Sequence, residues 1–275
     1  MNDSNKHFML YLEQKFNTLM VTTHLILLKK WGVAIILIFS FFFNLKETKA
    51  QQFNTDNYLT MSHGTTTVTM TAGGRNSGAI LSFALIPNWE FFVQTSLFWE
   101  NEKELVPQHF NLQGYAKYMF WVNKENDGGG AVFLGFGRSP GYWDETEFLQ
   151  SHRSIWTAVP ITFVLFNKTI SWDLMPGALL DWSNTDINEA ALGFTYSTRI
   201  AVYKIIPKSA IVGEVYGTAG SAYSKPEYKI GFRWEPNNTI VPAISYGRAF
   251  DGSSGARLEI GVTIFTPQYL KKPVN

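Results

Sequence analysis

The chain has no cysteine among its 275 residues. Its absence excludes disulfides, metal sites built on thiolates and a lipoprotein anchor attached to cysteine. Charged residues are also scarce, at 16%, against about 25% in an average soluble domain. The formal net charge is +1, which gives no electrostatic basis for binding nucleic acid.

Long hydrophobic runs are missing as well. The longest, Trp31–Phe43, is shorter than the ~20 residues of a spanning helix. Lys29 and Lys30 precede it and a short polar stretch ending at Ala50 follows, which is typical of a cleavable signal peptide. We expect cleavage after Ala50; the alternative is a transmembrane anchor. Residues 1–19 are mostly polar, so translation starts at either Met1 or Met20.

Aromatic residues, in contrast, are abundant, at 16% of the chain. A lipid-facing surface bounded by two aromatic girdles would use them, whereas the alternative is the core of a soluble β-sandwich. The candidate girdle residues lie near the ends of predicted strands: Trp89, Trp99, Trp121, Trp182, Tyr203, Trp234, Phe250 and Phe265.

Residues after the signal alternate between apolar and polar with period two. In 257–264, for example, Leu258 and Ile260 face away from Arg257 and Glu259, because successive strand side chains alternate faces. The pattern predicts twelve strands, several of them long enough to cross a bilayer at a tilt: 65–72, 77–86, 89–99, 109–122, 129–138, 153–165, 168–182, 188–202, 208–218, 226–235, 238–249 and 255–266.

The connections between these strands alternate between short turns and longer loops, as in outer-membrane barrels. Two connections fit this alternation less well, because 123–128 is long for a periplasmic turn and 72–76 is short for an external loop. Pro160, Pro176 and Pro242 lie inside predicted strands. Since proline cannot donate to the ladder, we expect either bulges there or strand boundaries other than those predicted.

These patterns predict an all-β fold: a transmembrane antiparallel up-and-down barrel of about 12 strands. The expected organisation is an N-terminal extension and signal peptide over 1–50, a periplasmic segment over 51–64, the outer-membrane barrel over 65–266 and a tail over 267–275.

Four segments resemble a group of Bacteroidetes outer-membrane proteins. That group is similar to the transporter-like family named after the MetA pathway of phenol degradation. The resemblance covers most of 53–270, and the Ala50-Gln51-Gln52 junction also resembles Bacteroidetes usage. It implies an outer-membrane barrel that passes small apolar or aromatic compounds, and it supplies no catalytic residues. The segments are Phe53–Gly64, Lys204–Lys208, Val212–Gly217 and Glu259–Pro267.

The predicted inner face carries ionisable residues, and ions inside a barrel must be paired or hydrated. They indicate either a structural network that fills the lumen or a narrow polar pathway with surplus positive charge, which would weakly favour anions. The candidate lumen-lining residues are Lys117, Asp173, Arg199, Glu214, Lys229, Arg233, Arg257 and Glu259.

Outside the lumen, two weaker candidates remain. The long connection 139–152 holds Tyr142, Trp143, Asp144, Glu145 and Glu147, which could bind a cation or a sugar but are more simply a solvated loop. His152 and Ser154 share a strand face and are the best candidates for a hydrolase, although no acid is identified to orient the histidine. No histidine pair has metal-ligand spacing.

The leading hypothesis is therefore passive transport or binding of a small solute in the outer membrane. The alternatives are a closed structural or interaction barrel and a membrane-embedded lipid hydrolase. We expect no enzyme activity, no cofactor, no metal and no nucleic-acid partner; the expected partners are outer-membrane lipid and a small-molecule solute.

Overall fold

The computed structural model describes residues 53–74, 76–99, 107–137, 154–182, 190–252 and 255–270, all within the compact unit 46–275. No helix in these ranges is long and apolar enough to cross a membrane. The strands are β1 (Thr65–Gly73), β2 (Asn76–Ile86), β3 (Trp89–Trp99), β4 (Pro107–Val122), β5 (Gly129–Phe136), β6 (Ser154–Ala158), β7 (Ile161–Leu165), β8 (Ile170–Leu174), β9 (Gly177–Asp181), β10 (Ala191–Tyr203), β11 (Ser209–Gly220), β12 (Ser224–Trp234), β13 (Ile240–Ala249) and β14 (Arg257–Phe265).

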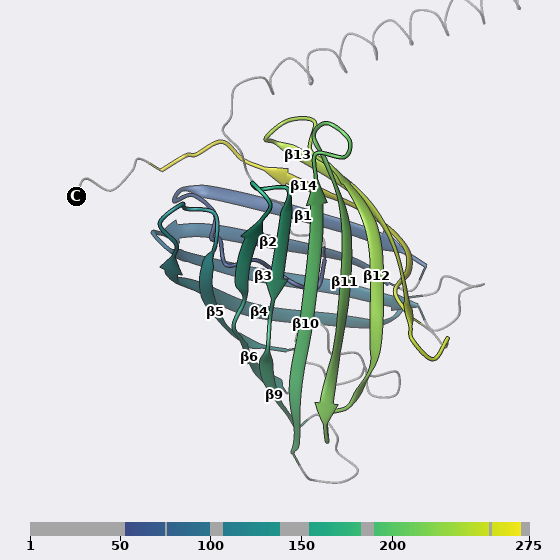
Figure 1. The fold of residues 1–275 in the computed structure, drawn as a ribbon. Coiled ribbons are helices and arrows are strands. Elements are labelled where there is room, and N and C mark those ends of the chain that lie inside the picture. Colours follow the sequence, from purple (N-terminus) through teal and green to yellow (C-terminus); the bar gives the residue numbers. More distant parts are fainter. Residues whose placement is uncertain are drawn as a thin grey trace, which may run out of the picture. The chain divides into compact units, whose positions relative to one another are not determined.

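These strands close into one antiparallel barrel (Figure 1). Neighbours in sequence pair around the wall, β1 pairs with β14, and β10 pairs with β11 to complete the circle. Strands β6 and β7 lie end to end, as do β8 and β9, so each of these pairs makes one wall strand. The wall thus has twelve strands, and the fold predicted from the sequence is confirmed.

Two prolines explain why two wall strands are broken. Val159-Pro160 separates β6 from β7, and Met175-Pro176 separates β8 from β9. The breaks lie side by side, since the amide N of Val159 donates to Pro176 O at 2.8 Å. At Pro242 the predicted bulge is wrong: the register with β14 continues through Pro242↔Val262. The ladder with β12 ends one residue away, at Arg233↔Ala243, so the missing N–H interrupts no pairing there.

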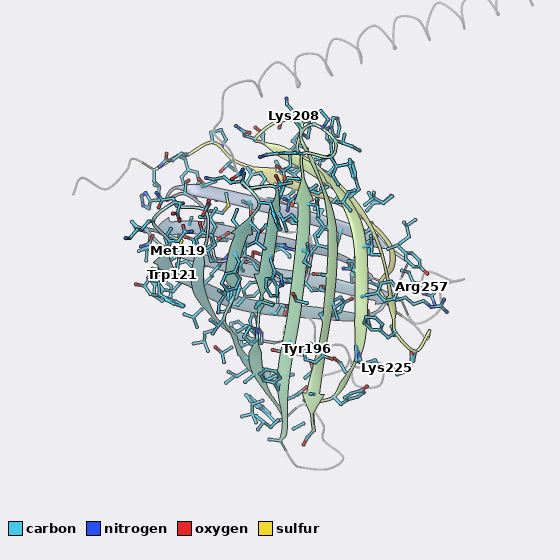
Figure 2. The ribbon with its side chains drawn as sticks, viewed as in Figure 1. Met119, Trp121, Tyr196, Lys208, Lys225 and Arg257 are labelled. Carbon is cyan, nitrogen blue, oxygen red and sulfur yellow. The ribbon has the colours of Figure 1, made fainter. Side chains whose placement is uncertain are left out.

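One end of the barrel, the turn end, carries the connections after β2, β4, β7, β10 and β12. The C-terminal ends of β1, β3, β5, β9, β11 and β13 lie at the other end of the barrel, the loop end. The connection 123–128, long for a turn, is closed by one side chain. Asn123 Oδ1 accepts from the amide N atoms of Asp127 and Gly128 at 3.0 and 3.2 Å. Its Nδ2 donates to Asp127 Oδ1 at 2.8 Å. In Figure 2, Lys208 marks the turn end and Lys225 the loop end.

The wall has a polar inner face and an apolar outer face, as the period-two pattern predicts. On β10, Thr195, Ser197 and Arg199 are buried, whereas Phe194 and Ile200 are 55% and 47% exposed. Trp121, 49% exposed, projects outward near the turn end (Figure 2).

Two of the predicted girdle aromatics face inward instead. Phe265 is only 2% exposed and packs on Val241, and the hydroxyl of Tyr203 accepts from Arg233 Nη2 at 2.7 Å. Both follow from alternation, because Phe265 shares the face of Thr263 and Tyr203 shares the face of Ala201.

Candidate functional site

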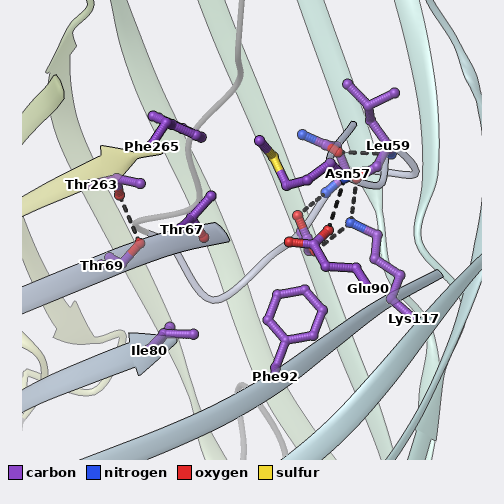
Figure 3. A pocket seen from close by; sticks show the side chains of 12 residues that line it. Asn57, Leu59, Thr67, Thr69, Ile80, Glu90, Phe92, Lys117, Thr263 and Phe265 are labelled. Atoms are coloured by element: carbon purple, nitrogen blue, oxygen red, sulfur yellow. Dashed lines mark hydrogen bonds and ion pairs between the residues drawn. The ribbon is translucent and has the colours of Figure 1, made fainter. Parts of the chain in front are cut away.

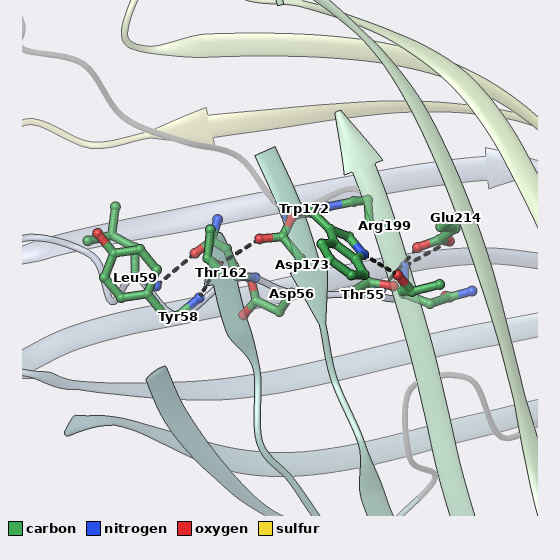
Figure 4. Close-up of polar contacts among 12 residues, drawn as sticks. Thr55, Asp56, Tyr58, Leu59, Thr162, Trp172, Asp173, Arg199 and Glu214 are labelled. Atoms are coloured by element: carbon green, nitrogen blue, oxygen red, sulfur yellow. Dashed lines mark hydrogen bonds and ion pairs between the residues drawn. The ribbon is translucent and has the colours of Figure 1, made fainter. Parts of the chain in front are cut away.

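Residues 53–61, which precede β1 by three residues, lie inside the barrel; we call this segment the strap. It contacts inward-facing side chains of β11 and β7 (Figure 4), and others of β4 and β3. Five of its side chains are buried: Phe53, Thr55, Asp56, Tyr58 and Thr60. The sequence predicts a periplasmic segment over 51–64, and its compartment stays a prediction; the alternation pattern gave no sign that it would enter the lumen.

Glu214 of β11 holds the beginning of the strap. Its two carboxylate oxygens accept from the amide N atoms of Asn54 and Thr55 at 3.1 and 3.0 Å. Glu214 is 3% exposed, so each charge-assisted hydrogen bond stabilises a carboxylate that water hardly reaches. The carboxylate and the strap backbone therefore satisfy each other.

Lys117 of β4 holds the middle of the strap. Its Nζ donates to Asp56 Oδ2 and to Leu59 O, both at 2.7 Å, and it lies 5.3 Å from the centre of the Phe133 ring. Lys117 is 1% exposed and Asp56 3%. Removing one partner of such a buried pair costs roughly 3–5 kcal/mol, because the other charge is left uncompensated.

A relay of polar groups extends from the strap to the wall through Thr162 of β7. The Thr162 hydroxyl accepts from the amide N of Tyr58 at 3.1 Å and donates to Asp173 Oδ1 at 2.7 Å. Asp173 Oδ2 then accepts from Nε and Nη2 of Arg199 at 3.0 and 2.8 Å. The predicted lumen residues Asp173 and Arg199 are thus neighbours, and they orient the hydroxyl that binds the strap.

Glu90 of β3 holds the last part of the strap, and sequence reasoning missed it. Its Oε2 accepts from the amide N of Met61 at 3.1 Å, and its Oε1 from the Ser82 hydroxyl at 2.7 Å. The signal was available, since Glu90 alternates with Phe91 at the start of a strand. Figure 3 shows Glu90 and Lys117 directed toward the strap.

Small residues on the wall make room for the aromatic rings of the strap. A Cβ at Gly129 would collide with the ring of Tyr58 and with Trp121 O. Phe53 packs in a buried cluster with Ala201, Ala210 and Val212. The strap is therefore held by shape as well as by polar contacts.

A cluster of aromatic side chains fills another sector of the lumen. Phe92 stacks on Tyr115, with centroids 4.5 Å apart and planes 11° apart. Tyr115 lies 5.3 Å from Trp156 and 5.7 Å from Phe133. These four side chains, from β3, β4, β5 and β6, are at most 6% exposed. The polar lumen predicted from the sequence did not include this aromatic cluster.

Two other predicted lumen residues, Lys229 and Arg233, pair with acids of the wall and of a turn. Lys229 Nζ lies 2.7 Å from Glu259 Oε2 and 4.0 Å from Glu214 Oε1. Arg233 Nη2 lies 2.8 Å from Glu235 Oε1, and Arg257 is half-buried at the start of β14.

Among the residues to which the sequence assigned a surplus of positive charge, Arg199, Lys229 and Arg233 each have an acidic partner, as does Lys117. The predicted surplus is therefore reduced. Two of those acids were not placed in the lumen by the sequence analysis. Asp56 comes from the strap, and Glu235 comes from a turn.

A cavity of about 30 Å³ remains between the strap and the wall. A single water needs roughly 10–15 Å³, so the cavity holds about two waters and no organic solute. A solute that passes along this side of the lumen requires the strap to move. The lining residues are Asp56, Asn57, Leu59, Met61, Thr67, Thr69, Ile80, Glu90, Phe92, Lys117, Thr263 and Phe265 (Figure 3).

The remaining candidates gain no support as sites. Tyr142, Trp143, Asp144, Glu145, Glu147 and His152 lie outside the described residues. Ser154 is 2% exposed, and its hydroxyl donates to Gly137 O at 2.6 Å. Within the described ranges, no three His, Asp or Glu side chains gather as a metal site would need.

Comparisons with known proteins give structural likeness without sequence kinship. No family model and no curated protein matches the chain. Among solved structures, the KdgM porin in complex with disordered oligogalacturonate is 10% identical with a TM-score of 0.49, over 73% of this chain and 98% of that one. The COG4313 outer membrane channel from Pseudomonas putida F1 is 12% identical with a TM-score of 0.48, over 80% and 100%. The NanC porin is 9% identical with a TM-score of 0.44, over 75% and 99%.

Proposed function

We propose that this protein is an outer-membrane channel for passive transport of small solutes, and that the strap closes its lumen at rest. One observation carries the proposal: the barrel is polar inside and apolar outside. Leu134, Phe194 and Ile260 are 64%, 55% and 59% exposed, whereas Lys117 and Asp173 are 1% and 0% exposed.

Such a surface is unfavourable in water. Each exposed Leu, Ile or Phe forgoes about 1.5–3 kcal/mol of burial, and monomeric soluble proteins rarely expose contiguous apolar patches of this extent. A bilayer removes that cost. A closed barrel also satisfies its backbone groups within the wall, as hydrocarbon requires. Exposed Trp89, Trp121 and Trp234 at the turn end are placed where amphipathic rings prefer the membrane boundary.

The lumen suits a channel because its main obstruction is the strap, a segment that forms no strand of the wall. The strap is covalently continuous with the wall only at β1, and polar contacts to four wall strands hold the rest of it. Withdrawal of the strap breaks no wall pairing and opens the path next to Glu90, Lys117 and Glu214. The candidate lumen residues, from Lys117 to Glu259, then line the path.

The finer assignments belong to the same proposal. Export by a signal peptide cleaved after Ala50 would deliver the chain to the outer membrane. Membership of a Bacteroidetes group similar to the MetA-pathway family rests on the quoted segments alone. A small-molecule solute and outer-membrane lipid remain the proposed partners.

Osmotic swelling of proteoliposomes tests the proposal. Because the strap leaves the lumen transiently, the full-length protein, refolded into vesicles, should admit a small neutral solute such as arabinose faster than protein-free vesicles do. The same rate with and without folded protein would contradict the channel.

A closed structural barrel is the second candidate, and the filled lumen favours it. The aromatic cluster, the ion pairs and the strap leave little space in the described residues. This candidate predicts no swelling above background, either with the strap in place or after its displacement.

A further inference from the structure

The wall holds the strap mainly through features that any peptide possesses. Glu214, Thr162 and Glu90 accept from four backbone amides of the strap, and Lys117 donates to one backbone carbonyl. A single strap side chain, the carboxylate of Asp56, receives a charged contact from the wall. The recognised pattern is therefore an extended backbone with one acidic side chain.

These wall groups would be poorly satisfied without an occupant. Without the strap, Lys117 would lose both of its hydrogen-bond acceptors, Asp56 Oδ2 and Leu59 O. Glu214 would lose two amide donors and keep Lys229 at 4.0 Å. Because buried charges without partners are costly, an empty lumen favours a solute that offers amide N–H groups together with a carboxylate.

We propose that the wall between β3 and β11 is a recognition site for short acidic peptides, and that the strap is its built-in occupant. The proposal rests on the channel function proposed above and names the class of solute. A Thr-Asp dipeptide reproduces the Thr55-Asp56 contacts, with an amide at Glu214 and a carboxylate at Lys117. A neutral peptide satisfies Glu214 but not Lys117.

Uptake into proteoliposomes of the full chain tests this, with arabinose as the reference solute. The peptides are N-acetyl-Thr-Asp-amide and its neutral counterpart N-acetyl-Thr-Asn-amide. The acidic peptide should reach half-saturation at a concentration on the order of tenfold lower than the neutral peptide does. A tenfold difference corresponds to the free energy of one charge-assisted hydrogen bond. Equal values for the two peptides would overturn the inference.

Two variants locate the preference. Lys117→Met combined with Asp56→Asn removes both members of the ion pair, so neither is left buried without the other, and it should abolish the difference between the peptides. Lys225→Met makes the same change at an exposed lysine of the loop end and should retain the difference. A preference that survives the first variant would show that Lys117 does not recognise the acid.

The reference solute separates the two proposals. If arabinose does not enter, the channel function fails. If arabinose enters and the peptides are not distinguished, the channel stands and the recognition site fails. Gel electrophoresis of heated and unheated samples checks that each variant has folded as a barrel. The heated, unfolded sample should migrate more slowly than the unheated one.

Discussion

At the scale of single residues, the sequence placed charges in the lumen but did not show what they bind. Alternation along β4 and β11 predicts that Lys117 and Glu214 face inward, and both are buried. Their partners lie in the strap, which has no period-two pattern. The bond between Asn54 and Glu214 joins residues 160 positions apart. A local sequence pattern carries no information on such a contact. A charge that is predicted to be buried indicates only that it must have a partner.

The turn residue Asp127 gives a prediction about pH. The hydrogen bond from Asn123, and then the nearby Lys168, hold the pKa of Asp127 below its ordinary value. A carboxyl whose pKa is depressed in the folded state stabilises the fold above its unfolded pKa of about 3.9, and this contribution is lost as the pH falls through the lower folded value.

Asn123→Ala should therefore raise the pKa of Asp127, because the hydrogen bond from Asn123 is the largest single cause of its depression, and Lys168→Met should raise this pKa as well. A carbon NMR titration of the Asp127 carboxyl in detergent micelles measures both. The same pKa in Asn123→Ala and the unmodified protein would refute the role of the asparagine.

At the scale of elements, the sequence predicted the wall strands closely and their interruptions incompletely. Strand β3 has the predicted bounds, Trp89–Trp99. The ranges 153–165 and 168–182 each became two strands, because Pro160 and Pro176 fall on neighbouring wall strands and interrupt the same part of the sheet. The third proline, Pro242, lies where the ladder with β12 has ended. Whether a proline interrupts the sheet depends on how its strand is paired with its neighbours. The sequence of one strand does not reveal that pairing.

The outer face of β14 gives a prediction at this scale. Ile260 is paired with Ile244, which is paired with Phe232, so an apolar row crosses three strands. Arg at Ile260 should cost about 2–4 kcal/mol of folding free energy if the row lies near the bilayer midplane. Refolding titrations in lipid vesicles measure this cost.

Ile205 provides the matched control, since it is equally exposed, at 60% against 59%, but lies in the turn between β10 and β11. Arg at Ile205 should cost about 0–1 kcal/mol, as near the membrane boundary. Equal costs at the two positions would mean that the row does not face hydrocarbon.

At the scale of the whole molecule, the closed barrel of twelve wall strands follows from the sequence, and the state of its lumen does not. Eight strands fill their interior with side chains, while sixteen leave an aqueous channel, so a barrel of twelve is undecided by strand count. We propose that the strap decides it, a polar segment that precedes the barrel in sequence and lies inside it in space (Figure 4). Closure by the strap, rather than by the wall, is the central claim.

Reversible tethering of the strap tests that claim most directly. The chain has no cysteine, so Asp56→Cys with Lys117→Cys introduces one pair of thiols, one on the strap and one on the wall. A short bis-methanethiosulfonate should join the two thiols. A direct disulfide needs Cβ atoms ~3.8 Å apart, whereas the long lysine side chain holds the Cβ atoms of residues 56 and 117 farther apart than that. The same reagent on Lys225→Cys with Asp251→Cys, an exposed ion pair of 3.3 Å at the loop end, serves as the control.

Single-channel conductance in planar bilayers is the readout. With reduced thiols the strap has lost its ion pair, and the channel should conduct. Crosslinking should lower the conductance of the variant with cysteines at 56 and 117, and reduction should restore it. Crosslinking should leave the conductance of the control variant, with cysteines at 225 and 251, unchanged. Conductance that is unchanged by crosslinking at 56 and 117 would contradict closure of the lumen by the strap.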